Sequence, residues 1–223
     1  MRCRRAASAP LLRMTVACRP LPVRPSCRPP PSSARCTNDP SRVYFGSLSP
    51  MLTNAPKEEA MLIYLMQHGT AFPKEVNPEQ PLSPVGAEQV ESSARAMRAL
   101  GCKPELIIAS PKLRSRQTAV RVAAAMGIAE NEIMVSEAVK ATANSYVTLE
   151  FLAGLPHAES VFIAGHLPNL ERLAALLIAP DAKANVTFQN GGLTCIDAAR
   201  LENGQGTLLF HITPKQLRAI AGA

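Results

Sequence analysis

The fold is decided by residues 61–70, MLIYLMQHGT, in which an apolar run stops at a histidine followed by a glycine. Six consecutive apolar residues from Met61 to Met66 predict a strand buried on both faces, as in the centre of a parallel α/β sheet. His68 then lies at the carboxyl end of this strand. Ligands of open α/β sheets bind at that end, and Gly69 would allow a sharp turn or a close approach to a ligand. A single His-Gly pair is more often structural, so partners elsewhere must decide its role.

Strands and helices alternate along the rest of the chain. After the polar loop 70–82, Ser83 and Pro84 suit the start of a helix, and Gly101 and Gly127 suit the ends of two helices. We expect strands at 105–110, 133–135 and 160–164, and helices at 83–100, from the turn 110–119 to 126, at 145–152 and at 170–178. This alternation predicts an α/β fold, a three-layer α/β/α sandwich with a mainly parallel central sheet.

Right-handed crossovers would bring the turns after three of these strands to the same edge of the sheet. The later segments 186–188, 193–197 and 207–212 are expected to be further or edge strands. The last two are joined by residues 202–206, ENGQG, which indicate a hairpin.

Residues 1–50 differ in composition from the rest of the chain. They contain nine arginines, no lysine and one acidic residue, and carry a charge of +8, whereas residues 51–223 carry −1. The basic charge is therefore no evidence that the following domain binds nucleic acid. Nine of the 20 prolines and four of the six cysteines also lie there, without apolar periodicity. We expect residues 1–56 to be a disordered basic Pro/Arg-rich extension and residues 57–223 to form one domain.

Three explanations fit this extension: a transit peptide, a basic binding arm, or translated sequence upstream of a true start at Met51 or Met61. Its prolines oppose the amphipathic helix of a transit peptide, which favours a non-native extension. Nucleic-acid binding through the extension is an alternative that rests on this segment alone.

The remaining signals indicate a cytoplasmic protein without a membrane partner. The chain has no run of 18 apolar residues and no convincing secretory signal. Cys102 and Cys195 have no nearby ligand pattern, which predicts buried thiols in a reducing compartment. No Cys/His metal spacing, Walker-type loop or dinucleotide fingerprint occurs, so we expect no metal and no cofactor.

Two imidazoles and a guanidinium follow three of the predicted strands: His68, Arg114 and His166. Together they suit a phosphoryl group, because a phosphate dianion needs charge-assisted donors, and helix amino termini would add backbone N–H groups. His68 is the candidate nucleophile. Its attacking nitrogen must be unprotonated, and a backbone carbonyl at the strand end could hold the proton of the other nitrogen.

These segments resemble the histidine phosphatase superfamily, specifically its short phosphohistidine phosphatase branch. Residues 65–69, LMQHG, match the opening Arg-His-Gly motif; the second motif is matched within 110–119, SPKLRSRQTA, and the third by 165–168, GHLP. Residues 81–83 with Gly86 resemble the Pro-Leu-Thr stretch of the family. The resemblance covers roughly residues 61–212, and three motifs in order are far more specific than any one.

The resemblance implies a phosphoglycerate mutase-like fold and a role for each motif residue. It implies that His68 becomes phosphorylated, that Arg114 binds phosphate, and that His166 stabilises the transferring group. Gln67 and Gly69 are the adjoining phosphate-binding positions. Asn190 and Gly191 resemble a late loop near the site, to which we assign no role.

One position departs from the family, because Gln67 stands where an arginine normally precedes the nucleophile. Glutamine keeps two N–H donors but loses the charge, and charged hydrogen bonds contribute about 1.5–3 kcal/mol against roughly 1 kcal/mol for neutral ones. We expect lower activity or weaker phosphate affinity. Lys112 or Arg116 could supply the missing charge, although such residues are more often solvated.

The size of the chain separates the substrate classes. Sugar-phosphate and phytate members of the superfamily carry insertions that cover the site, whereas residues 70–82 and 129–160 leave little room for a cap domain. We therefore expect an open site. Glu75 and Glu79 are candidate proton donors, although loop carboxylates more often only face solvent.

The expected function is dephosphorylation of phosphohistidine in a signalling or phosphotransfer protein. Its leaving group is an imidazole with a reference pKa near 6.5, which needs less acid assistance than an alkoxide. Two alternatives stay open: a phosphohistidine- or phosphate-binding module with little turnover, and a small-molecule phosphomonoesterase. The partner protein and the oligomeric state are not predicted.

Overall fold

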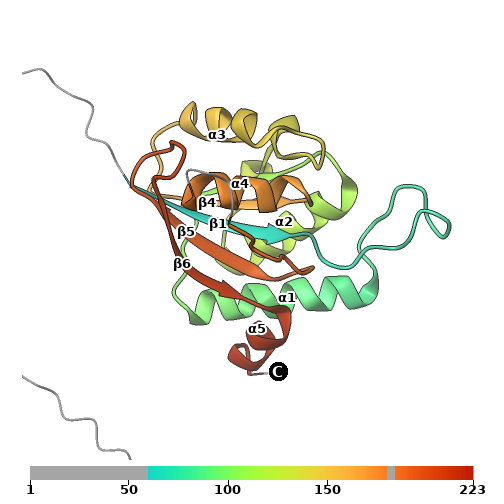
Figure 1. Ribbon diagram of the computed structural model, residues 1–223. Coiled ribbons are helices and arrows are strands. Elements are labelled where there is room, and N and C mark those ends of the chain that lie inside the picture. The colour runs from blue at the N-terminus through green and yellow to red at the C-terminus, as the bar shows by residue number, and fades with distance from the viewer. Residues whose placement is uncertain (1–59, 180–183, 223) are drawn as a thin grey trace, which may run out of the picture. The chain divides into compact units, whose positions relative to one another are not determined.

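A computed structural model describes residues 60–179 and 184–222, which contain one six-stranded sheet (Figure 1). The strand order is β3-β2-β4-β1-β5-β6. Strands β3, β2, β4 and β1 are parallel neighbours, while β5 and β6 add antiparallel pairs beside β1. Their bounds are β1 Met61–Gln67, β2 Leu106–Ala109, β3 Met134–Val135, β4 Ser160–Gly165, β5 Leu193–Ala198 and β6 Gly206–Ile212. The mainly parallel sheet is therefore confirmed, and the predicted extension 1–56 lies outside the described residues.

Helices cover both faces of the sheet (Figure 1), which confirms the predicted three layers. Helices α1, α2 and α5 share one buried cluster with the sheet, and α3 and α4 share the other. Their bounds are α1 Pro84–Ala99, α2 Leu113–Met126, α3 Ser145–Ala153, α4 Asn169–Ile178 and α5 Pro214–Ile220, with short 3-10 turns at Glu130–Glu132 and Glu137–Val139. No helix in the described ranges is long and apolar enough to cross a membrane.

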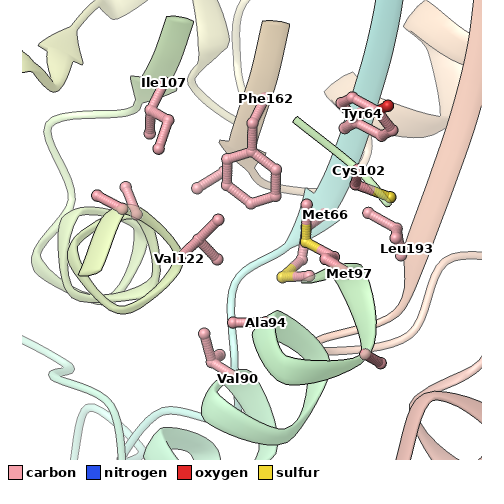
Figure 2. Close-up of a cluster of buried hydrophobic side chains, with 14 of the residues drawn as sticks. Tyr64, Met66, Val90, Ala94, Met97, Cys102, Ile107, Val122, Phe162 and Leu193 are labelled. Atoms are coloured by element: carbon pink, nitrogen blue, oxygen red, sulfur yellow. The ribbon is translucent and has the colours of Figure 1, made fainter. Parts of the chain in front are cut away.

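Strand β1 is buried on both faces because its side chains alternate between the two clusters. Ile63 and Leu65 pack with α3 and α4, while Tyr64 and Met66 pack with α1 and α2. Figure 2 shows Met66 beside Met97 and Phe162 in the cluster that the sheet shares with α1 and α2. The apolar run thus forms the predicted central strand, although one of its two neighbours, β5, is antiparallel.

The helix boundaries follow the predicted capping residues. The Ser83 side chain accepts a hydrogen bond from the Gly86 N–H, and Pro84 occupies the first turn of α1. Gly127 ends α2 in the left-handed region, with φ of 76°. Cys102 and Cys195 are buried free thiols, as predicted.

Two parts of the chain differ from the prediction. Residues 186–188 form no strand; Phe188 packs into the cluster beneath α4, and regular pairing resumes only after an isolated bridge between Asn190 and Gln67. Helix α5 was not predicted. Its start carries a capping box formed by Thr213 and Gln216, with Pro214 in the first turn.

The loop 70–82 returns to the sheet edge and closes on the start of α1. Ala71 bridges Leu82, and the Ser83 N–H donates to the Thr70 carbonyl at 2.9 Å. A Cβ on Gly86 would overlap that same carbonyl, so the helix and the loop touch through backbone alone. Gly69 is equally confined, because a Cβ there would lie 2.6 Å from the Gly86 oxygen.

We expect Gly86→Ala to destabilise the fold by about 1–3 kcal/mol, because the added methyl must push the loop away from α1. Elsewhere in a helix the same change stabilises by roughly 0.5–1 kcal/mol. Urea unfolding measures the effect. The matched control is Gly154→Ala, whose Cβ would lie 3.6 Å from its nearest neighbour. Equal stabilities for the two variants would contradict this account of the contact.

Candidate active site

The side chains of His68, Arg114 and His166 meet at the carboxyl edge of the parallel strands. His68 follows β1, His166 follows β4, and Arg114 lies in the first turn of α2, just after β2. Arg114 Nε donates a 2.9 Å hydrogen bond to His68 Nε2, and the two imidazole centroids are 4.9 Å apart. The structure therefore brings together residues separated by up to 98 positions in the chain.

His68 is held in one tautomer from both sides of its ring. Its Nδ1 lies 2.7 Å from the Gly69 carbonyl oxygen, which can only accept, so Nδ1 carries the proton. Its Nε2 accepts from Arg114 and is unprotonated. The backbone is also fixed, because the His68 N–H donates to the Gly165 carbonyl and Asn190 Nδ2 donates to the His68 carbonyl at 2.7 Å.

Both imidazoles are held neutral by their surroundings. The pKa of His68 falls from 6.5 to about 4, because burial, which is the largest cause, and the Arg114 charge lower it more than the hydrogen bond to Gly69 raises it. For His166, burial again comes first, followed by the charges of His68, Arg114 and Lys112, and its pKa falls to about 3. At neutral pH the site therefore holds two neutral imidazoles beside one guanidinium.

His166 is buried and is positioned by a serine that the sequence analysis did not single out. Ser110 Oγ lies 2.6 Å from His166 Nε2 and also accepts from the Lys112 N–H at 3.3 Å. The Ser110 N–H donates to Ser115 Oγ, whose hydroxyl donates to the Ala164 carbonyl on β4. Within the described part of the chain no hydrogen bond engages His166 Nδ1, which leaves that nitrogen available.

Gln80 is a second site residue that was missed. Its Oε1 accepts from Arg114 Nη1 at 3.1 Å, so the guanidinium joins Gln80 to His68. Gln80 has φ of 50°, which is uncommon for a residue other than glycine. Strained backbone of this kind clusters at functional sites. The available signal was its position directly before the Pro81-Leu82-Ser83 stretch.

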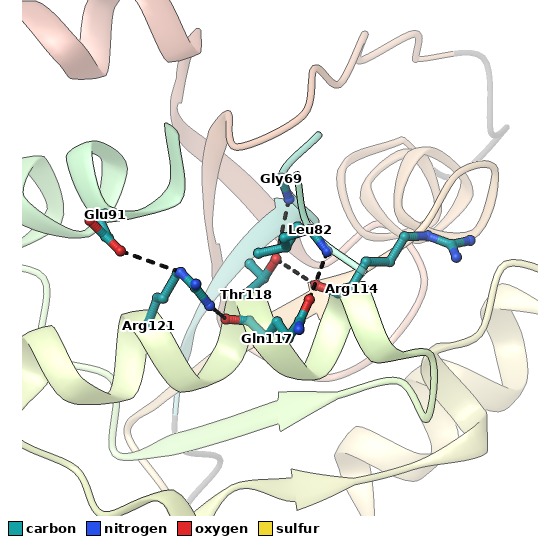
Figure 3. A network of polar contacts seen from close by, with 7 residues as sticks. All are labelled: Gly69, Leu82, Glu91, Arg114, Gln117, Thr118 and Arg121. Atoms are coloured by element: carbon teal, nitrogen blue, oxygen red, sulfur yellow. Dashed lines mark hydrogen bonds and ion pairs between the residues drawn. The ribbon is translucent and has the colours of Figure 1, made fainter. Parts of the chain in front are cut away.

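The remaining residues of the second motif hold the surrounding loops to α2 (Figure 3). Thr118 Oγ1 accepts from the Gly69 N–H at 3.2 Å and donates to the Arg114 carbonyl. Gln117 Oε1 accepts from the Leu82 N–H at 2.7 Å. One helix thus positions both the turn after β1 and the end of the 70–82 loop.

The other predicted residues lie around this centre. Gln67 is the last residue of β1, and its carbonyl accepts from the Gly191 N–H at 2.8 Å, so the late loop does reach the site. Lys112 and Arg116 are exposed, as are Glu75 and Glu79. In the described ranges, no cluster of three or more His, Cys, Asp or Glu side chains is arranged to hold a metal ion.

No family model matches the chain. An uncharacterized protein of Picosynechococcus is 28% identical over 164 residues, which cover 70% of this chain and 99% of the relative.

Several solved structures share the fold. The protein histidine phosphatase SixA in complex with tungstate matches with a TM-score of 0.62 and 21% identity, over 70% of this chain and 99% of the other. A protein of Agrobacterium tumefaciens assigned as phosphohistidine phosphatase SixA matches with a TM-score of 0.57 and 25% identity, over 69% and 98%. These neighbours are phosphatases, consistent with the predicted hydrolase. The resemblance predicted from the motifs is thus confirmed, and the chain has the fold of the histidine phosphatase superfamily.

Proposed function

We propose that the protein is a phosphohistidine phosphatase that transfers the phosphoryl group to His68 and then to water. The observation that carries this proposal is the state of His68 Nε2. It is an unprotonated ring nitrogen, aligned by the Gly69 carbonyl on the opposite nitrogen and lying 2.9 Å from a guanidinium nitrogen. A nucleophile and a phosphate-binding cation are therefore adjacent before substrate binds.

In the first step, His68 Nε2 attacks phosphorus while the bond between phosphorus and the substrate imidazole nitrogen breaks. Arg114 shifts its N–H groups from His68 and Gln80 to the phosphoryl oxygens, because a dianion is a stronger acceptor than a neutral nitrogen or amide. The electron pair of the broken bond stays on the substrate nitrogen. The departing imidazole leaves neutral when its other ring nitrogen already carries a proton.

In the second step, water attacks phosphorus, the bond to His68 breaks, and inorganic phosphate leaves with the water oxygen. The pair of electrons returns to His68 Nε2, which regenerates the neutral ring. His166 is placed to donate to the phosphoryl oxygens as charge builds up on them. A bound phosphate also raises the pKa of both imidazoles, because an opposite charge favours their protonated form.

The lack of a carboxylate in direct contact with the three site residues, within the described ranges, favours phosphohistidine over an alkyl phosphate. Among residues 60–179 and 184–222, no carboxylate makes a hydrogen bond or ion pair with His68, Arg114 or His166. An alkoxide would need a proton from such a group, whereas an imidazole leaves readily without it. Similarity to SixA structures, described as phosphohistidine phosphatases, supports the same substrate class.

A phosphohistidine-binding module with little turnover is the second candidate function, because Gln67 lacks the charge of the usual arginine. Phosphoryl transfer depends on positive charge placed against the phosphoryl oxygens. The site could then bind a phosphoryl group and react slowly.

The first prediction concerns protonation. We expect His68 to titrate near pH 4 and His166 near pH 3, measured from the ring proton signals by NMR. Arg114→Gln should raise both values, because that guanidinium charge lowers them. The unfolded chain takes up these protons near pH 6.5, so the free energy of unfolding should fall as pH is lowered from about 6.5 to 4. Titration of His68 near 6.5 would show a solvated ring instead.

The second prediction tests the covalent step. His68→Ala should lower turnover of a phosphohistidine peptide by at least about a thousandfold, because it removes the nucleophile. His157→Ala, at an exposed histidine, is the matched control and should keep wild-type turnover. Wild-type protein quenched rapidly in base should carry phosphate on His68, and all reactions should proceed in EDTA. Wild-type turnover by His68→Ala would overturn the mechanism.

The third prediction tests whether the missing charge at Gln67 limits the rate. Gln67→Arg should raise kcat/KM about tenfold, the equivalent of roughly 1.4 kcal/mol from one charged hydrogen bond. Gln67→Met, which removes the donors, should lower it. A flat or reduced rate in Gln67→Arg would mean that Lys112 or Arg116 already supplies the charge and is crowded by the new arginine.

A further inference from the structure

A cavity of about 310 Å³ adjoins the candidate phosphate site. The cavity lies between the 70–82 loop and the start of α2. Arg114 connects it to the candidate phosphate site, because this residue lines the cavity and its Nε also contacts His68. Lys112 and Arg116 line the same cavity, together with Gln80 and Glu79. A substrate whose phosphoryl group lies at His68 would therefore have its neighbouring groups close to this cavity.

The cavity carries unbalanced positive charge. Its lining holds three cationic side chains and only one carboxylate, that of Glu79. In the described part of the chain, none of the three cations makes an ion pair. Lys112 and Arg116 are exposed, and the charge of Lys112 reaches far enough into the site to lower the pKa of His166.

This arrangement opposes the stability of α2. The amino terminus of a helix favours negative charge, yet the first turn of α2 contains no acidic residue, and Lys112 stands at its N-cap without a side-chain capping bond. Lys112 and Arg116 line the same cavity at the start of α2, so their like charges repel. Anionic ligands would remove both penalties.

We propose that this basic cavity, lined by Lys112, Arg114 and Arg116, binds a carboxylate side chain of the substrate protein close to its phosphohistidine. The proposal rests on the proposed function, because it places the phosphoryl group at His68. Exposed cations beside a reaction centre mainly raise the association rate and favour negatively charged partners. Both effects suit a substrate protein that binds briefly and dissociates. The cavity thus defines a substrate class: phosphohistidine with an acidic neighbour.

The test uses the full chain and a series of phosphohistidine peptides. Each peptide carries one glutamate at a position from four residues before to four residues after the phosphohistidine. A matched control peptide carries glutamine at the same position. At one or more positions, kcat/KM should be about three- to tenfold higher for glutamate, the range expected for one or two exposed ion pairs. Raising ionic strength from 0.02 to 0.5 M, chosen to shorten the screening length, should remove the preference.

Lys112→Gln with Arg116→Gln should bring the glutamate-to-glutamine ratio close to one. The matched control is Arg98→Gln with Lys103→Gln, which removes two exposed basic side chains that line a separate cavity and should keep the wild-type ratio. Circular dichroism and unfolding curves check that both double variants fold.

Three outcomes would count against the proposal in different ways. Equal turnover of glutamate and glutamine peptides at every position would overturn the acidic-neighbour inference and leave the proposed function standing. If the glutamate-to-glutamine ratio of kcat/KM fell to one in both double variants, the preference would arise from the overall charge of the protein, which would also overturn the inference. Turnover of none of the peptides would overturn the proposed function itself, and the inference with it.

Discussion

Parallel pairing of β1, β4 and β2 is the constraint on which the site depends. Because these strands run in the same direction, their carboxyl ends share one edge, and the residues that follow each strand meet there. The site is then locked by backbone contacts. Gly69 and Gly86 allow the turn after β1 to touch α1 directly, and Thr118 accepts the Gly69 N–H from α2. The position of His68 is thus set by the packing of both helices.

Burial dominates the electrostatics of this edge. It is the largest cause of the lowered pKa of both His68 and His166, ahead of the neighbouring charges. A guanidinium beside a neutral imidazole is a stable arrangement, because Arg114 donates to a lone pair that carries no competing proton. A phosphoryl group bound as proposed would change this balance, since its negative charge would attract Arg114 and favour protonation of the rings. Binding of that group would therefore be coupled to uptake of a proton.

Two neutral amide side chains lie close to the three site residues. Gln67 directly precedes His68, at the position where the resembled family has an arginine, and Gln80 accepts a hydrogen bond from Arg114. Among the described residues, Arg114 is the one cationic side chain that contacts His68, while Lys112 and Arg116 lie exposed at the rim. Two of these three cationic side chains therefore lie at the edge of the site rather than at its centre. This distribution agrees with the proposed substrate, which has a good leaving group and a second anionic group near the rim.

The sequence by itself determined the strand and helix pattern apart from residues 186–188 and α5, the start of α1, the end of α2, and the three motif turns. These features depend on local apolar runs and on residues such as Ser83 and Gly127 that act within a few positions. The two antiparallel neighbours at β5 and β6 were expected only as later or edge strands, because pairing between distant segments leaves no local signal.

Only the tertiary structure decided which residues contact the imidazoles and the guanidinium. The Ser110 contact with His166 and the Gln80 contact with Arg114 join segments 56 and 34 residues apart. Ser110 opens the second motif and Gln80 directly precedes the Pro81-Leu82-Ser83 stretch, but neither position tells which side chain the residue contacts. The depressed pKa values also required the fold, because burial of a ring depends on the whole set of elements packed around it. Local chemistry thus predicts which groups can react, and long-range packing sets their partners and their charge.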